Sequence, residues 1–274
     1  MTTETLAKQA PPARSPSLPD QTDSSPKPIN YETGYLPQPI EYPDSDGQPM
    51  AESDFQFEPL AYAVESLKRH FQDRADVYVA GNIFFYFEEG RPSKVVAPDV
   101  LVIIGAEKRK RHSIKLWEEP KAPDFVLEIT SHSTRSTDQG SKKGTYEFLG
   151  VTEYFCYDPT GDYLKPPLIG YRLKDGLYVP IPPKERTDSL VVMTSESLGL
   201  ELRAEGRDFR FVNPQSAKVL RNLAESEAAF LQSETGRLQA EAARTQAESG
   251  RLQAEARIRD LEAQLAALKS GSSR

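Results

Sequence analysis

Two stretches, VVAPDVLVII at Val95–Ile104 and APDFVLEIT at Ala122–Thr130, decide the fold and the chemistry predicted for this chain. Each is a short run rich in Val, Ile, Leu and Phe, which is typical of a buried β-strand. Each also carries a carboxylate within or beside its apolar run, Asp99 in the first and Glu128 in the second. A buried carboxylate needs a compensating partner, and a cation is one of the few adequate partners. The two segments therefore predict a cation site on neighbouring strands.

A helix after the second strand supplies a lysine to the same site. The apolar spacing predicts this helix over Asp138–Leu149, ended by Gly150. Lys142 and Tyr146 lie one turn apart on one of its faces, which we expect to pack against the strand that carries Glu128. Two acids on adjacent strands with a lysine nearby predict Mg²⁺-assisted cleavage of a phosphodiester. A salt bridge within the core is the alternative interpretation.

Each residue of this predicted site has a role in the hypothesis. Asp99 and Glu128 bind Mg²⁺, or Mn²⁺ in its place, and the backbone carbonyl of Ile129 adds a third ligand. Lys142 orients the attacking water or stabilises the charged phosphate. Three further side chains are accessory candidates, namely Glu65, Asp138 and Tyr146. For Glu65, which lies beside the apolar stripe of the first helix, a solvated position is the alternative.

The densest basic cluster of the chain directly follows the first of the two strands. It consists of Lys108, Arg109, Lys110 and Arg111. A run of charges is usually a solvated loop. Its position after a candidate catalytic strand favours a second interpretation equally, in which these four side chains contact the phosphates of DNA.

Composition divides the chain into three parts. Residues 1–50 are rich in Pro and Ser and predict a disordered arm, and residues 51–212 predict the globular domain. In residues 215–274 the segment GRLQAEAAR (Gly236–Arg244) recurs fourteen residues later as GRLQAEARI (Gly250–Ile258), an offset of two heptads. This repeat predicts a C-terminal coiled coil for self-association, and a long lone helix is the alternative.

The overall composition excludes several classes of protein. A formal net charge of −7 argues against a constitutive, non-specific nucleic-acid coat. One cysteine, Cys156, cannot form an internal disulfide and predicts a reducing cytoplasm. We expect no membrane span, because no apolar run reaches the roughly 18 residues that a span needs. Three histidines and one cysteine offer no zinc-ligand spacing.

The order helix, three-stranded meander, helix and strand, with a PD acid and then an E-x-x acid, resembles the PD-(D/E)XK nuclease superfamily. More closely, the chain resembles the Uma2 family of restriction endonucleases over roughly residues 50–215. The matching segments are APDV at Ala97–Val100, PDFVLEITSHSTRSTD at Pro123–Asp138, K-x-x-x-Y at Lys142–Tyr146 and GVTEYFCYDP at Gly150–Pro159. The resemblance implies an α/β restriction-endonuclease-like core, to which the residue pattern itself adds an extra β-hairpin and a long C-terminal helix that lies outside the match. It also implies a Mg²⁺ site at Asp99 and Glu128 and a nuclease role on DNA.

One position departs from the superfamily pattern. The lysine that usually stands two residues after the second acid is Thr130 here, and the resemblance implies that Lys142 replaces it from the following helix. Two hypotheses follow. The chain is a Mg²⁺-dependent DNA endonuclease, dimeric through its core or its C-terminal arm. Alternatively, it is a catalytically inactive nuclease-like protein that acts in assembly through its C-terminal coiled coil.

Overall fold

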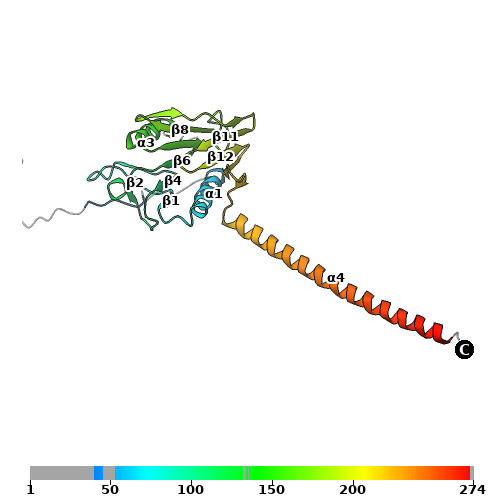
Figure 1. Cartoon of the computed structure of the whole chain (residues 1–274). Helices are drawn as coiled ribbons and strands as arrows, with labels where there is room; N and C mark the ends of the chain where they lie inside the picture. Colours follow the sequence, from blue (N-terminus) through cyan, green and yellow to red (C-terminus); the bar gives the residue numbers. More distant parts are fainter. Residues whose placement is uncertain (1–39, 46–52, 132–133, 135, 137, 272–274) are drawn as a thin grey trace, which may run out of the picture. The chain divides into compact units, whose positions relative to one another are not determined.

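The computed structural model describes residues 40–45, 53–131, 134, 136 and 138–271 (Figure 1). The predicted disordered arm of residues 1–50 lies outside these residues except for residues 40–45. In chain order the elements are α1 (Asp54–His70), β1 (Val77–Gly81), β2 (Phe85–Tyr86), β3 (Val95–Val96), β4 (Val100–Ile104), β5 (Ile114–Lys115), η2 (Leu116–Glu118), β6 (Phe125–Ile129), η3 (Asp138–Lys142), α3 (Lys143–Leu149), β7 (Glu153–Tyr157), β8 (Leu168–Lys174), β9 (Leu177–Pro180), β10 (Glu185–Arg186), β11 (Leu190–Ser195), β12 (Leu200–Glu205), β13 (Asp208–Asn213), β14 (Lys218–Val219) and α4 (Leu223–Gly271). The mixed α/β class predicted from the sequence is confirmed.

The largest sheet carries both predicted acidic segments. Its strand order is β1-β4-β6-β7-β8-β9, so β4 and β6 are direct neighbours (Figure 1). The pairs β1–β4 and β4–β6 are antiparallel, whereas β6 and β7 run parallel. A parallel pair needs a crossover connection, and η3 and α3 lie in the segment that joins β6 to β7. The crossover helix is thereby placed beside the strand that carries Glu128.

Local sequence explains the boundaries of these elements. All five residues of β6 and all five of β7 are buried, which accounts for their largely apolar sequences, FVLEI and EYFCY. α3 ends at Gly150, whose φ of 81° is the left-handed conformation that glycine adopts without a Cβ penalty. The π-helical turn η3 precedes α3, so the predicted helix over Asp138–Leu149 is present in two parts.

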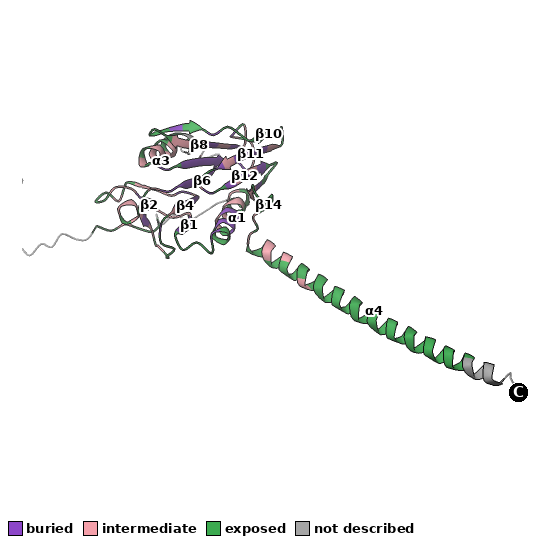
Figure 2. Ribbon diagram, in the orientation of Figure 1, coloured by how far each residue is buried: buried purple, intermediate pink, exposed green. Residues whose placement is uncertain are grey.

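Two hydrophobic layers cover the main sheet, one on each face (Figure 2). On one face, Val79, Val102 and Leu127 belong to a cluster that also holds α1 and the five-stranded sheet β10-β11-β12-β13-β14. On the other face, Leu101 and Val126 pack with residues of α3 and of the small sheet β3-β2-β5. The main sheet is therefore the middle layer of the domain.

Tyr62 of α1 joins this helix to the five-stranded sheet by hydrogen bonds as well as by packing. Its hydroxyl donates to the carbonyl of Leu220 at 2.8 Å and accepts from the backbone N–H of Phe211 at 3.0 Å. Burial raises the pKa of Tyr62 to about 12, so the hydroxyl remains a donor throughout the physiological range. The phenol thus satisfies two backbone groups at the seam between α1 and the second sheet.

Three features differ from or extend the sequence predictions. The single strand predicted over Val95–Ile104 is two strands, β3 and β4, separated by Ala97, Pro98 and Asp99, because Pro98 lacks the N–H that a central strand needs. The sequence predicted one extra hairpin, which β8 and β9 form, but not the five-stranded sheet that follows it. The long C-terminal helix is confirmed as α4, while its coiled-coil pairing stays a prediction. Within the described residues, no helix combines the length and the apolar character of a membrane span.

Candidate active site

The register of β4 and β6 brings Asp99 and Glu128 together. Val100 pairs with Leu127 in this antiparallel ladder, so continuing the register by one residue sets Asp99 opposite Glu128. Side chains of directly opposed residues share one face of the sheet, with Cβ atoms about 4.5–5.5 Å apart. The backbone N–H of Ile129 donates to Asp99 Oδ2 at 2.6 Å and ties the first carboxylate to the strand of the second.

Glu128 is fully buried, and the crossover helix supplies two donors to its carboxylate. The Lys142 ammonium donates to Oε2 at 2.8 Å, and the Tyr146 hydroxyl donates to Oε1 at 2.7 Å. Glu128 and Tyr146 are both 0% exposed, and the Lys142 side chain is 19% exposed. The helix packs against the strand of Glu128 on the face that its spacing predicts. The ammonium therefore lies against a carboxylate that has been removed from water.

The donor set of this pair fits a hard divalent cation. Two carboxylates held directly opposite one another repel unless a positive charge lies near them, and carboxylate oxygens are the ligands that Mg²⁺ prefers. Within the residues that the structure describes, no group of three or more His, Cys, Asp or Glu side chains could hold a metal ion. Mg²⁺ usually binds through one or two carboxylates and completes its shell with waters and substrate phosphates. The pair Asp99 and Glu128 meets that requirement.

The remaining predicted site residues have different positions. Tyr146 is brought into the site, and Ile129 contributes its N–H to Asp99, while its carbonyl as a metal ligand stays a prediction. Glu65 is exposed on α1, a helix that packs with the opposite hydrophobic layer of the sheet. The side chain of Asp138 lies outside the part of the chain that the structure describes.

Thr130 stands at the position where the superfamily pattern has its lysine. It is 1% exposed, and its N–H donates to the carbonyl of Tyr157 at 2.7 Å. Its hydroxyl is buried and has no hydrogen-bond partner among the described residues. Position 130 follows position 128 by two, so Thr130 and Glu128 point to one face of the strand. The positively charged side chain beside Glu128 is instead that of Lys142.

The basic cluster is partly used by the fold. Arg111 forms a bidentate pair with Glu119 at 2.6 and 2.9 Å, and both side chains are 3% exposed. Lys108 donates to the carbonyls of Phe71 and Gln72 at the end of α1, at 2.9 and 3.0 Å. These two cations fix the loop in place. The sequence predictions grouped all four basic residues together, because only distant partners decide which charges the fold uses.

Asp158, just after β7, is a fully buried acid that the sequence predictions did not single out. Its Oδ1 accepts from the N–H and hydroxyl of Thr160 and from the N–H of Gly161, while Oδ2 accepts from the N–H groups of Tyr163 and Leu164. Burial alone would raise the pKa of Asp158, but these hydrogen bonds outweigh it and the pKa lies below its usual value. This carboxylate organises a loop.

Comparison with known proteins finds one matching family and a similar solved structure. The Uma2 family model, described as "Putative restriction endonuclease", matches residues 35–205. A solved structure, "Crystal structure of a putative nuclease belonging to DUF820 from Anabaena variabilis ATCC 29413 at 1.96 A resolution", is similar with 17% sequence identity and a TM-score of 0.38. That similarity covers 55% of this chain and 76% of the other chain. The search of curated proteins gives no match.

Proposed function

The chain belongs to the Uma2 family of restriction endonucleases, and from this membership we propose that it is a Mg²⁺-dependent endonuclease that hydrolyses phosphodiester bonds of DNA. The observation that carries the proposal is that Asp99 accepts from the N–H of Ile129, the residue after Glu128, at 2.6 Å, while Lys142 donates to Glu128 at 2.8 Å. A nuclease of this kind must hold a divalent cation and place positive charge beside a phosphate. Asp99 and Glu128 would hold the divalent cation, and Lys142 would place the positive charge.

Each residue has one part in the proposed hydrolysis. Asp99 and Glu128 would hold Mg²⁺, which when bound stabilises charge on the phosphate and acidifies a coordinated water. The Ile129 N–H and the Tyr146 hydroxyl donate to the two carboxylates and would hold them in place for the cation. The Lys142 ammonium supplies the positive charge that a phosphate oxygen or the attacking water needs. Water adds to phosphorus and gives up a proton to solvent, the P–O bond of the leaving group breaks, and the leaving oxygen takes up a proton from solvent.

Cleavage of plasmid DNA in Mg²⁺ or Mn²⁺ tests the proposal. Asp99→Asn and Glu128→Gln should each abolish cleavage, and calorimetric titration of Mg²⁺ should show that they lose saturable metal binding. Glu185→Gln removes an exposed carboxylate on β10 and should cleave like the native chain. Circular dichroism establishes that each variant is folded. Undiminished cleavage by a folded Glu128→Gln variant would refute the proposed site.

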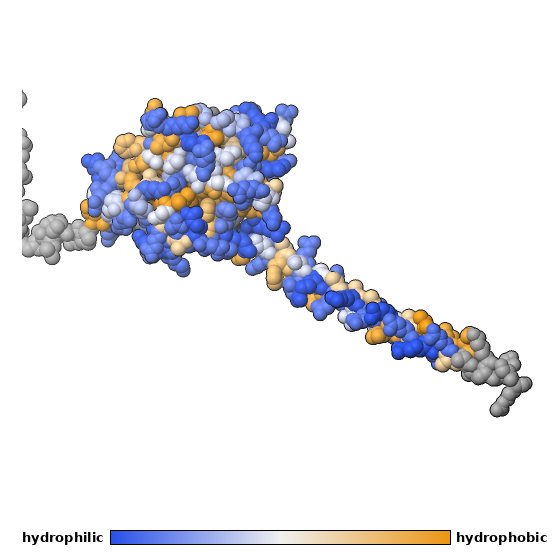
Figure 3. All heavy atoms as spheres, in the orientation of Figure 1, coloured by the Kyte–Doolittle hydropathy of each residue, from blue (hydrophilic) through white to orange (hydrophobic). Residues whose placement is uncertain are grey.

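We also propose that α4 joins two copies of the chain. Its apolar side chains at heptad spacing are largely exposed, with Leu231, Leu238 and Leu252 at 65%, 57% and 53%. Figure 3 shows apolar atoms distributed along this helix among hydrophilic ones. A second copy of the same helix would cover this stripe, since identical heptads present matching seams. The proposal accounts for exposed leucines that a lone helix leaves in water.

Light scattering on the full chain tests this pairing. Exchange of the three leucines for lysine should convert a dimer into a monomer, because charges would then line the seam. Ala240→Lys/Ala247→Lys/Ala254→Lys places the same charges on the opposite side of the helix and should leave the dimer intact. A native chain that is monomeric at high concentration would contradict the pairing.

A further inference from the structure

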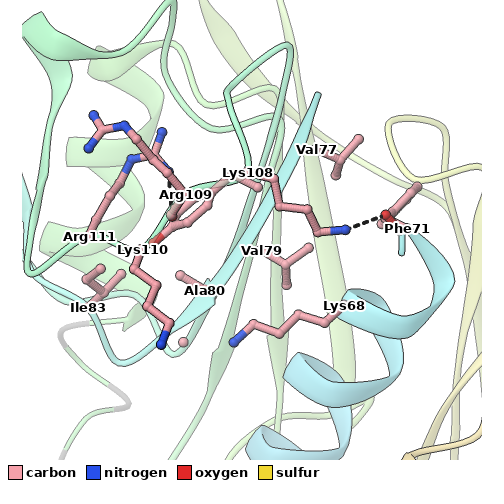
Figure 4. A pocket seen from close by; sticks show the side chains of 12 residues that line it. Lys68, Phe71, Val77, Val79, Ala80, Ile83, Lys108, Arg109, Lys110 and Arg111 are labelled. Carbon is pink, nitrogen blue, oxygen red and sulfur yellow. Dashed lines mark hydrogen bonds between the residues drawn. The ribbon is translucent and has the colours of Figure 1, made fainter. Parts of the chain in front are cut away.

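A basic pocket lies along the open edge of the main sheet (Figure 4). Its volume is about 500 Å³. β1 forms its floor, α1 contributes Lys68 and Phe71 on one side, and the loop of residues 108–111 closes the other side. Among the residues that line it, five carry a cationic side chain and none carries a carboxylate. In a chain of net charge −7 this is a local concentration of positive charge.

Two of these cations remain available to a ligand. Lys108 and Arg111 are bound to the end of α1 and to Glu119. By contrast, neither Lys68 nor Lys110 forms an ion pair with any residue that the structure describes, and both are exposed. Figure 4 shows the two side chains extending toward one another, Lys68 from α1 and Lys110 from the loop. Lys68 follows Val64 by four residues at the border of the apolar stripe of α1, a position that the sequence predictions did not consider.

Backbone groups add to the pocket because β1 is an edge strand. The N–H of Gly105 donates to the carbonyl of Asp76, and the N–H of Asn82 donates to the carbonyl of Asp99. In an antiparallel pair the residues that bond to the neighbour alternate, so the even-numbered residues of β1 face β4. The N–H groups of Val79 and Gly81 consequently point to the open edge.

Gly81 lets β1 pack closely against α1 and against the segment that carries Asp99. A Cβ at Gly81 would lie 2.5 Å from Val64 Cγ2 and 2.9 Å from the carbonyl oxygen of Asp99, so no side chain fits there. Gly81 also pairs with Val100, the residue after Asp99. β1 is two strands from β6, which corresponds to roughly 10 Å. A nucleic-acid strand at Asp99 and Glu128 would therefore pass within reach of this edge.

We propose that this pocket binds a backbone phosphate of the nucleic acid, away from the phosphate that is cleaved. Lys68 and Lys110 neutralise the phosphate, and the N–H groups of Val79 and Gly81 donate to its oxygens. The inference rests on the proposed nuclease function. Two cations that converge from opposite sides fit one compact anion. An acidic peptide that extended the sheet could pair only along the five residues of β1.

Salt-dependent binding of a labelled DNA duplex and of a single strand, with Ca²⁺ in place of Mg²⁺, tests the pocket. Loss of one phosphate contact should lower the slope of log affinity against log salt by about 0.9 for duplex and about 0.7 for single strand. At 0.1 M salt relative to 1 M, this corresponds to roughly eightfold and fivefold weaker binding for Lys68→Gln/Lys110→Gln. Lys174→Gln/Lys218→Gln changes two lysines outside the pocket and should retain the native slope. Thermal unfolding establishes that both variants are folded.

The outcomes separate the pocket from the nuclease function. An unchanged slope in the pocket variant refutes the pocket, even if the native chain cleaves DNA. A reduced slope in a chain that never cleaves DNA supports the pocket and refutes only the nuclease function. If the native chain binds neither the duplex nor the single strand, the pocket is refuted. The proposal would also be overturned if an octa-glutamate peptide bound the native chain but not Lys68→Gln/Lys110→Gln, while the two chains bound DNA equally. That result would identify a peptide site.

Discussion

Lys142→Met is expected to destabilise the native chain by about 3 kcal/mol near neutral pH. The Glu128 carboxylate is 0% exposed, and the variant removes the ammonium that lies 2.8 Å from Oε2. Breaking a buried ion pair by removing one partner typically costs about 3–5 kcal/mol, because a charge remains in a place from which water is excluded. The Tyr146 hydroxyl still donates to the other oxygen, which sets the expected loss at the lower end.

A double-mutant cycle isolates the pair from the packing of the lysine stem. In Glu128→Gln/Lys142→Met both charges are absent, and the amide can still accept from the Tyr146 hydroxyl. We therefore expect the double variant to be more stable than the sum of the single losses predicts, by about 2 kcal/mol. Saturating Mg²⁺ should stabilise Lys142→Met more than the native chain, because in the variant Mg²⁺ replaces the cation that Glu128 has lost.

Urea unfolding in EDTA measures these differences. With a slope of about 3 kcal/mol per molar urea, the Lys142→Met loss lowers the midpoint by about 1 M. The control is Lys143→Met, in which the lost ammonium lies 3.8 Å from the Tyr171 ring centroid and costs about 1 kcal/mol or less. Strictly additive losses in the cycle, or equal losses at positions 142 and 143, would refute the idea that Lys142 compensates a buried carboxylate.

Four further predictions concern the rest of the domain. Tyr62→Phe leaves two buried backbone groups without their hydroxyl partner and should cost about 1–3 kcal/mol in urea unfolding. Because the pKa of Asp158 is lowered in the folded chain, its ionised carboxylate stabilises the fold fully at pH values above the ordinary aspartate pKa, and progressively less as the pH falls through the folded pKa. Asp158→Asn should therefore flatten the loss of stability below about pH 4 in an acid titration. Gly170→Ala should lower the melting temperature, because its Cβ would lie 2.5 Å from the Phe155 ring. By contrast, Gly144→Ala, which meets nothing within 4 Å in a helix, should gain up to about 1 kcal/mol.

The strands nearest the site could be predicted because their signals are local. β6 and β7 are mostly apolar in the sequence, with one glutamate each, and both are wholly buried in the structure. The acids were recognisable for the same reason, since a charge beside or within such a run has few explanations. Tyr146 was expected beside Lys142 from the helical period alone, and its hydroxyl does bind Glu128.

Features that depend on distant partners could not be predicted in the same way. The strands β12 and β13 largely alternate between buried and less buried positions, and β11 has three consecutive buried residues, yet a single strand does not reveal which strands it pairs with. The same limit applies to the basic loop. Whether Arg111 is a surface charge or a buried one depends on Glu119, and whether Lys108 is available depends on the end of α1.

In the proposed site the lysine stands on the crossover helix, at Lys142, rather than at position 130 of the strand, and the two positions differ in how exposed they are. A lysine at position 130 would bring its stem and charge to a point that is 1% exposed. Lys142 enters from a π-helical turn, a form often found at functional sites, and its side chain remains 19% exposed. The helix can thus present an ammonium to Glu128 while part of the side chain contacts solvent, which lowers the cost of desolvating it. In the proposed nuclease, the positive charge beside Glu128 would thus come from the crossover between β6 and β7, at a lower desolvation cost than from position 130 of the strand.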